Sequence, residues 1–185
     1  MRLFAAVLPP EDVTAELAAA VRDLRTIAGA DRLRWTGRLG WHFTLAFYGE
    51  VGADAVPELS ARLRRVAQGS DPFDLALRGG GHFGDRALWV GARGGVPALR
   101  RLAEGAAAAG RAAGIEPGES RRYRPHLTLA RGSGTDFTDY VAALEDWDGQ
   151  AWTVDALCLI RSRLPRSGVP GEQPRYETLE RWSFS

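Results

Sequence analysis

Hydrophobic residues recur along the chain at two spacings, which predict alternating helices and strands. A helical spacing of three or four residues occurs over 10–28, 53–67, 97–113 and 137–144. Short apolar or alternating runs typical of strands lie at 2–8, 41–48, 73–78, 87–92, 127–131, 152–163 and 176–184. Several neighbouring strands are separated by little more than a turn. The pattern therefore predicts an α+β fold with antiparallel sheets.

Length and composition narrow the class of protein. The chain has 185 residues, of which 45% are hydrophobic and 25% charged, so disordered and fibrous classes are excluded. Nothing resembles a linker, and we expect one bilobal domain over 1–185. No apolar run approaches the length of a membrane span. The single cysteine, Cys158, sits in an apolar strand, which favours a buried thiol and a reducing compartment. We expect a cytoplasmic monomer that does not bind membranes.

The basic residues are unusual in kind rather than in number. Lysine and arginine together number 24, and all of them are arginine. A GC-rich genome explains this bias, and so does recognition of phosphate through the forked donors of the guanidinium group. The two explanations are compatible, and composition does not separate them.

The strongest signal is a repeated pentapeptide. His42-Phe43-Thr44-Leu45-Ala46 and His126-Leu127-Thr128-Leu129-Ala130 agree at four of five positions, although the chain has only three histidines. The two copies lie about half a chain length apart. This internal repeat indicates two related lobes.

Strand geometry suggests why the repeat has this form. Alternation places His42 and Thr44 on one face of a strand, and Phe43, Leu45 and Phe47 on the other. The second copy repeats the arrangement. If the lobes face each other, two imidazoles and two hydroxyls converge in a cleft.

Two imidazoles and two hydroxyls suit displacement at phosphorus. One imidazole takes a proton near neutral pH while the other gives one, and the hydroxyls donate to phosphoryl oxygens. No metal is needed for these proton transfers. A metal site built on His42 and His126 is disfavoured, because no cysteine or carboxylate lies at ligand spacing near either histidine.

On these residues the chain resembles the 2H phosphoesterases, and in particular the bacterial and archaeal RNA 2′,3′-cyclic phosphodiesterases, also called 2′-5′ RNA ligases. The resemblance covers nearly the whole chain. Besides the paired motifs it includes Arg2-Leu3-Phe4-Ala5, Gly81-His82-Phe83, Arg86-Ala87-Leu88-Trp89-Val90-Gly91 and Ser162-Arg163-Leu164. Two positions depart from it: Tyr48 replaces an aliphatic residue, and His82 occupies a variable position.

The resemblance implies two pseudo-symmetric lobes, each an antiparallel sheet with helices on its outer face, around a V-shaped cleft. It implies hydrolysis of RNA 2′,3′-cyclic phosphate ends to 2′-phosphomonoesters without metal or cofactor, with reverse 2′-5′ ligation as a possible second activity. His42 would be the proton donor and His126 the proton acceptor. Thr44, Thr128 and Arg131 would hold the phosphoryl oxygens. A pseudo-symmetric pair exchanges roles in the reverse reaction, so the sequence does not determine which histidine is the donor.

A basic loop precedes the second motif. Arginines 121, 122 and 124 with Tyr123 suit an RNA backbone and a stacked base. We therefore include Tyr123 and Arg124 among the candidate substrate-binding residues. A solvated loop without function explains the same residues equally well.

Two other functions fit the same residues. One is an enzyme that acts on a cyclic-phosphate nucleotide metabolite or a 2′-5′ linked oligonucleotide, and the other is a non-catalytic module that binds RNA ends. The run 79–84 matches G-x-G-x-x-G, but the segment after it is typical of a strand, whereas a dinucleotide-binding turn leads into a helix.

Overall fold

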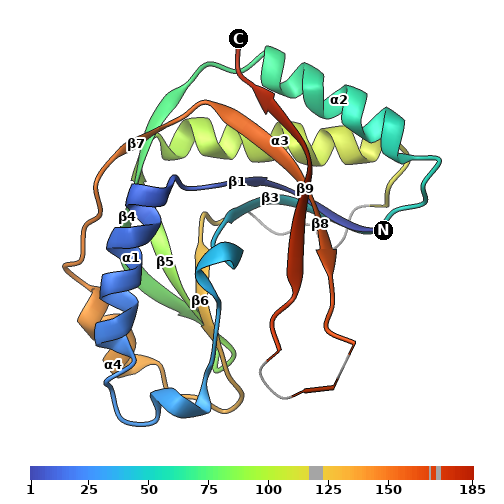
Figure 1. Cartoon of the computed structure of the whole chain (residues 1–185). Coiled ribbons are helices and arrows are strands. Elements are labelled where there is room, and N and C mark those ends of the chain that lie inside the picture. The colour runs from blue at the N-terminus through green and yellow to red at the C-terminus, as the bar shows by residue number, and fades with distance from the viewer. Residues whose placement is uncertain (117–122, 167, 170–171) are drawn as a thin grey trace.

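The computed structural model describes residues 1–116, 123–166, 168–169 and 172–185. Within them the chain forms two antiparallel sheets and four α-helices, which confirms the predicted α+β class (Figure 1). The strands are β1 (Arg2–Val7), β2 (Arg34–Trp35), β3 (Phe43–Glu50), β4 (Phe73–Phe83), β5 (Ala87–Gly94), β6 (Leu127–Arg131), β7 (Trp152–Val154), β8 (Ala156–Arg163) and β9 (Arg175–Ser183). The helices are α1 (Glu11–Leu24), α2 (Val56–Gln68), α3 (Val96–Ala112) and α4 (Thr138–Leu144).

Each repeat lies in a different sheet. The first sheet has strand order β3-β1-β8-β9, and the second has strand order β2-β6-β5-β4-β7. Strand β3 carries the first repeat, and β6 carries the second. Helices α2 and α3 lie over the first sheet, and α1 and α4 flank the second (Figure 1). The two lobes inferred from the repeat are therefore present.

Local sequence explains where the helices begin. Pro9 and Pro10 end β1, and acidic residues occupy the first turn of α1, where the helix dipole favours them. Proline stands in the first turn of α2 and of α3, where its missing N–H costs nothing. Among the described residues, no helix combines the length and the apolar character needed to cross a membrane.

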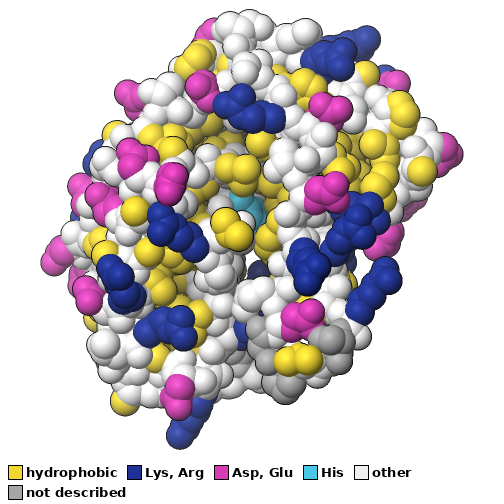
Figure 2. Space-filling model, viewed as in Figure 1, with side chains coloured by type: hydrophobic (Ala, Val, Ile, Leu, Met, Phe, Trp, Pro, Cys, Tyr) yellow, Lys and Arg dark blue, Asp and Glu magenta, His cyan; other side chains and the backbone are white. Residues whose placement is uncertain are grey.

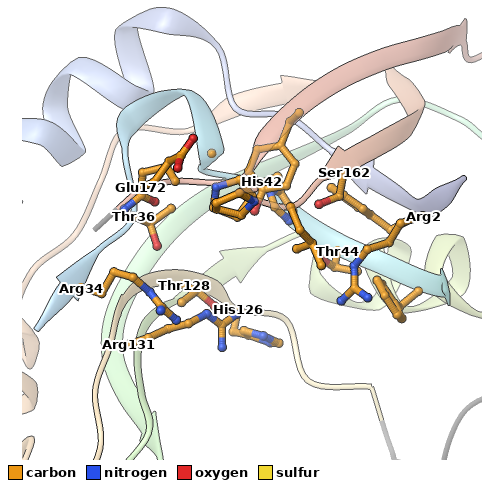
Figure 3. A pocket seen from close by; sticks show the side chains of 18 residues that line it. Arg2, Arg34, Thr36, His42, Thr44, His126, Thr128, Arg131, Ser162 and Glu172 are labelled. Carbon is orange, nitrogen blue, oxygen red and sulfur yellow. The ribbon is translucent and has the colours of Figure 1, made fainter. Parts of the chain in front are cut away.

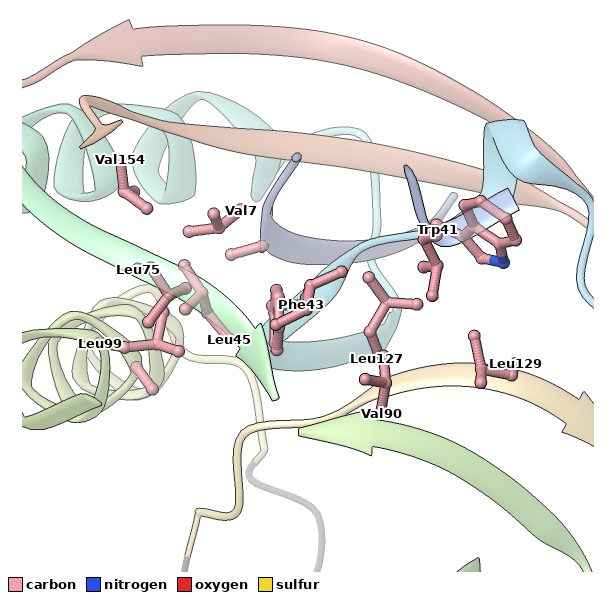
Figure 4. Packing of buried hydrophobic residues seen from close by; sticks show 14 of the residues in the cluster. Val7, Trp41, Phe43, Leu45, Leu75, Val90, Leu99, Leu127, Leu129 and Val154 are labelled. Carbon is pink, nitrogen blue, oxygen red and sulfur yellow. The ribbon is translucent and has the colours of Figure 1, made fainter. Parts of the chain in front are cut away.

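The apolar faces of the two repeats share one core. Phe43 and Leu45 of β3 point toward the same interior as Leu127 and Leu129 of β6 (Figure 4). All four are at most 4% exposed. Burial of these large side chains fixes the opposite faces of both strands toward the space between the lobes.

Strand β3 has a β-bulge inside its repeat. Ala46 lies opposite Ala5 of β1, and Thr44 lies opposite Ala6, so Leu45 between them has no partner in the ladder. One extra residue in a strand interrupts the regular alternation of its side chains.

Strand β6 has the same bulge at the same place in its repeat. Ala130 lies opposite Leu88 of β5, and Thr128 lies opposite Trp89, which leaves Leu129 without a partner in the ladder with β5. The leucine of each His-x-Thr-Leu motif is therefore the bulged residue.

The bulge changes which residues reach the space between the lobes. Beyond it, the fifth residue after each histidine returns to the histidine side, and these residues are Phe47 and Arg131. The prediction that Phe47 shares the core face with Phe43 is wrong, because simple alternation stops at Leu45. Phe47 is 52% exposed.

Two other sequence predictions need correction. The glycines of 79–81 lie inside β4 rather than forming a loop between strands: Gly80 and Gly81 pair with β5, and Gly79 is skipped at a register shift. A Cβ atom on Gly81 would overlap the ring of Trp89, so glycine here makes room for that indole. The predicted strand over 152–163 is two strands, β7 and β8, which belong to different sheets.

Candidate active site

The two repeats form opposite walls of one cleft. His42 directly precedes β3 and Thr44 lies in it; His126 directly precedes β6 and Thr128 lies in it. All four side chains line a cavity of about 500 Å³ (Figure 3). That volume is typical of sites for small ligands. The structure thus brings together the four residues that the repeat singled out.

The rest of the cleft is mainly basic and aromatic, although Glu172 also lines it. Guanidinium groups reach it from Arg2, Arg34 and Arg131. Aromatic rings reach it from Phe4, Phe47 and Tyr176, and further polar groups from Thr36, Ser162 and Gln173. An anion with an attached ring system suits this combination of donors and flat apolar surfaces.

The ring of His126 is held by the backbone. Its Nδ1 lies 2.8 Å from the carbonyl oxygen of Arg124. An N–H at Nδ1 donates to that carbonyl, which leaves the lone pair of the neutral ring on Nε2. Phe83 meets the ring edge-on, with centroids 4.8 Å apart. The arrangement suits a proton acceptor.

The ring of His42 is packed between aromatic groups. Phe4 lies 4.7 Å and Tyr176 5.4 Å from it, centroid to centroid. Burial lowers the pKa of His42 from 6.5 to about 4, against a hydrogen bond to the Gly40 carbonyl that raises it. The nearby His126 and Arg131 lower it further. Each histidine is therefore oriented by a backbone carbonyl and enclosed by aromatic rings.

Both histidines are neutral in the free cleft near pH 7. Burial is also the main cause that lowers the pKa of His126, with Arg131 and Arg124 contributing in the same direction. An anion between the rings would offset burial and favour a proton on one imidazole. The cleft is therefore suited to acquire its acid together with an anionic ligand.

The two motif strands differ at the fifth residue after each histidine. Arg131 extends into the cleft from β6, but the equivalent residue of β3 is Phe47. The Arg2 guanidinium lies over the Phe47 ring, 4.7 Å from its centroid. A cation thus reaches both sides of the cleft, one from the motif strand itself and one from β1.

Two residues of the basic loop lie outside the lining of the cleft. Tyr123 packs against the hydrophobic core, and Arg124 offers its carbonyl oxygen to His126. Neither side chain is among the described residues that line the cleft. Residues 121 and 122 lie outside the described residues, and His82 lies on β4 with its ring bonded to the Gly84 carbonyl.

Sequence reasoning missed several cleft residues. Arg2 and Ser162 are opposite each other in the β1–β8 ladder, and Tyr176 joins them from β9. The segments holding them carry the family resemblance, but no local pattern shows that they meet. Within the described part of the chain, no group of three or more His, Cys, Asp or Glu side chains is placed to hold a metal ion.

Known proteins share both sequence and fold with this chain. The sequence profile of the 2′-5′ RNA ligase superfamily matches residues 9–166. A Thermus thermophilus protein named RNA 2′,3′-cyclic phosphodiesterase is 33% identical over 196 residues, spanning 100% of this chain and 90% of that protein. An Aeropyrum pernix protein of the same name is 32% identical over 145 residues, spanning 75% of this chain and 79% of that protein. The crystal structure of Escherichia coli LigT complexed with 3′-AMP matches with a TM-score of 0.78 and 25% identity, covering 100% of this chain and 98% of LigT. In sequence and in fold, the chain belongs to the 2′-5′ RNA ligase superfamily, as the paired His-x-Thr-Leu motifs predicted.

Proposed function

We propose that the protein hydrolyses the 2′,3′-cyclic phosphate at the end of an RNA chain to a 2′-phosphomonoester, without a metal ion. The observation that carries the proposal is the pair of His-x-Thr strands, which face each other across one cleft with the same bulge. Relatives named RNA 2′,3′-cyclic phosphodiesterase support the choice of substrate, and so does the LigT complex with 3′-AMP.

In the proposed reaction, water forms a bond to phosphorus while the bond from phosphorus to the 3′ oxygen breaks. Nε2 of His126 takes the proton from water, and His42 gives a proton to the leaving 3′ oxygen. His42 acquires that proton when the anionic phosphate enters, since burial keeps the ring neutral before then. The two proton transfers balance, so neither needs a metal-bound water.

Charge develops on the oxygens of phosphorus that neither enter nor leave. The hydroxyls of Thr44 and Thr128 donate to these oxygens, and Arg131 adds its charge beside them. If an RNA 5′ hydroxyl takes the place of water, its oxygen bonds to phosphorus while the 3′ oxygen leaves, and the same two proton transfers give a 2′-5′ bond. Ligation therefore belongs to this proposal as the same displacement with a hydroxyl of RNA as the nucleophile.

The experiment is direct. Purified protein in EDTA is incubated with a short RNA that ends in a 2′,3′-cyclic phosphate, and the position of the product phosphate is determined. We expect a 2′-phosphate, and we expect His42→Ala and His126→Ala each to lose roughly 10²–10⁴ in rate. The double variant should lose less than the product of the single losses, because the pair acts as a unit.

Other outcomes favour the rival functions. Turnover of cyclic mononucleotides or 2′-5′ linked oligonucleotides, but not of cyclic RNA ends, would indicate a metabolite phosphodiesterase. Retention of the RNA end without turnover would indicate a binding module. Full activity in either single histidine variant would refute the assignment.

A change of leaving group distinguishes the proposed proton donor, His42, from the proposed proton acceptor, His126. A phosphodiester whose leaving group is 4-nitrophenolate hardly needs an acid, because that phenolate is stable without a proton. On this substrate His42→Ala should recover most of its lost rate, whereas His126→Ala should not. Recovery in His126→Ala instead would exchange the two roles.

A further inference from the structure

A second hollow opens beside the cleft, at the end of the first sheet. Its volume is about 540 Å³, and it shares Arg2, Ser162, Leu164, Pro165, Glu172 and Gln173 with the cleft. The two spaces therefore adjoin each other, and the second lies past the N-terminus of β1, at the adjoining ends of β8 and β9. We call this second space the arginine hollow.

Its lining is strongly basic. Besides Arg2, the arginine hollow is lined by four arginines, Arg161, Arg163, Arg166 and Arg175. Figure 2 shows basic side chains gathered on this side of the molecule, where the N-terminus and β8 lie in Figure 1. Two carboxylates, Glu50 and Glu172, also line the hollow, so arginine still outnumbers acid there.

Most of this charge is not neutralised by nearby carboxylates. Arg163 pairs with Glu177 at 3.5 Å, and Glu50 pairs with the amino group of Met1 at 3.3 Å. Arg161, Arg166 and Arg175 have no carboxylate within ion-pair distance among the described residues. Unpaired guanidinium groups lining a concave surface suit the oxygens of phosphate groups.

The proposed substrate fixes the direction in which an RNA chain leaves the cleft. A cyclic phosphate occupies the 3′ end, so the rest of the RNA continues only through the 5′ oxygen of the last sugar. The next phosphodiester groups must then lie in a space adjoining the cleft. The arginine hollow adjoins the cleft through six shared residues and carries the charge that phosphodiesters need.

We propose that the arginine hollow binds the backbone phosphates of the nucleotides that precede the cyclic end, and so makes an RNA chain a better substrate than a cyclic mononucleotide. This inference rests on the proposed function for its direction, but the binding of single-stranded RNA can be measured without any reaction. Because the contacts are to phosphates, we expect binding to be independent of base sequence and weakened by salt.

The test uses a fluorescent RNA of six nucleotides with free 2′ and 3′ hydroxyls at its end, which the enzyme cannot hydrolyse. Binding is followed by anisotropy over a range of salt concentrations. In Arg161→Gln/Arg175→Gln we expect Kd to rise about tenfold. The slope of log Kd against log salt should fall by about 1 to 1.5, as expected when two phosphate contacts are lost.

The matched control is Arg64→Gln, which removes one arginine from the exposed surface of α2. It should leave both Kd and slope unchanged. An equal Kd and slope in the double variant and the wild type would overturn the inference, whatever reaction the enzyme catalyses.

Kinetics provide the second measurement. The double variant should lose about tenfold in kcat/KM on a six-nucleotide RNA with a cyclic end, yet match the wild type on a cyclic mononucleotide. Equal losses on both substrates would also overturn the inference. A wild-type enzyme that hydrolyses neither would refute the proposed function, and the anisotropy result would then still decide whether the hollow binds RNA.

Discussion

Each histidine is useful because of what encloses its ring. A backbone carbonyl orients one ring nitrogen, and aromatic neighbours remove water from around the imidazole. Burial disfavours the charged form, so the protonation state of the pair depends on whether an anion lies between the rings. In the proposed reaction, substrate binding and acquisition of the catalytic proton are therefore coupled at these two residues.

This coupling predicts a difference between two pH profiles. The kcat/KM profile reports the free enzyme, in which one imidazole must be charged and the other neutral. Because the pKa values of both are lowered, that of His42 from 6.5 to about 4, kcat/KM should peak below pH 6.5 and fall as the pH rises. The kcat profile should decline at a higher pH, since bound phosphate raises these pKa values.

Arg131 gives a check on that prediction. Its charge lowers the pKa of both histidines. Arg131→Gln should therefore move the falling limb of kcat/KM to higher pH, besides reducing its maximum. Profiles of kcat and kcat/KM that decline at the same pH, in steady-state assays where chemistry limits the rate, would contradict the coupling.

The threonines offer a second prediction at this scale. Thr44→Val and Thr128→Val keep the shape of the side chain but remove the hydroxyl donor, and each should lower kcat by roughly 10²–10³. Thr44→Ser and Thr128→Ser keep the donor and should retain most of the rate. Steady-state kinetics of the four variants test this. Similar losses for valine and serine would mean that shape, not hydrogen bonding, matters there.

Single residues were predicted where the sequence repeats itself. His42, Thr44, His126 and Thr128 could be found because the same pentapeptide occurs twice. Arg2 and Tyr176 could not, since their approach to the cleft depends on the register of β1 and β9 against strands distant in sequence.

At the scale of the element, the paired bulges determine what each motif strand presents. Regular alternation predicts that the fifth residue after each histidine is buried, and only the ladder register reveals the extra residue at the leucine. Bulges depend on pairing partners and leave no period in the sequence. The face of Phe47 was wrongly predicted for that reason.

Helix α3 and strand β3 pack closely where a large residue of the strand meets a glycine of the helix. Tyr48 places its ring against Gly110 of α3 and donates its hydroxyl hydrogen to the Ala106 carbonyl at 2.8 Å. A Cβ atom on Gly110 would lie 2.7 Å from that ring. The large ring of Tyr48 is thus accommodated by a glycine on the facing helix.

Whether Gly110→Ala raises or lowers the free energy of unfolding therefore depends on the residue at position 48. Alanine favours a helix over glycine by ~1 kcal/mol, but overpacking costs about 1–3 kcal/mol. We expect Gly110→Ala to destabilise the wild type and to stabilise the Tyr48→Leu variant. Urea unfolding of the four proteins in this cycle measures the coupling. The same change in both backgrounds would show that the contact is unimportant.

The lowered pKa of His42 makes the stability of the whole molecule sensitive to acid. The unfolded chain protonates His42 near pH 6.5, whereas the folded protein does so only near pH 4. The unfolded state therefore binds more protons between these values, and stability falls as the pH drops through this range.

The prediction compares how the free energy of unfolding of the wild type and of His42→Phe depends on pH. Between pH 7 and pH 4, the free energy of unfolding should fall by up to about 3 kcal/mol more in the wild type than in His42→Phe, which has no proton to bind at that position. Urea titrations at several pH values measure both curves. Parallel curves would indicate that His42 is protonated equally easily in the folded and unfolded states.

Fold class was predictable from periodicity, but the division into sheets was not. The run 152–163 is apolar enough to suggest one strand, yet its two parts pair with β4 and with β1 and β9. Propensity identifies a strand and says nothing of its partners. The repeat, rather than the pattern of strands, was what indicated two lobes.

The difference between Phe47 and Arg131, the fifth residues after the two histidines, bears on whether the product carries a 2′- or a 3′-phosphate. A cyclic phosphate offers water two bonds to break, and two strands with the same bulge and the same His-x-Thr residues provide nearly equivalent halves for that choice. Only groups that differ between the halves can favour one product isomer. Phe47 beneath Arg2 on one side and Arg131 on the other are such groups, and they lie within the cleft itself. Under the proposed function, we therefore expect the regiochemistry of ring opening to depend on this pair, at which the two halves of the cleft differ.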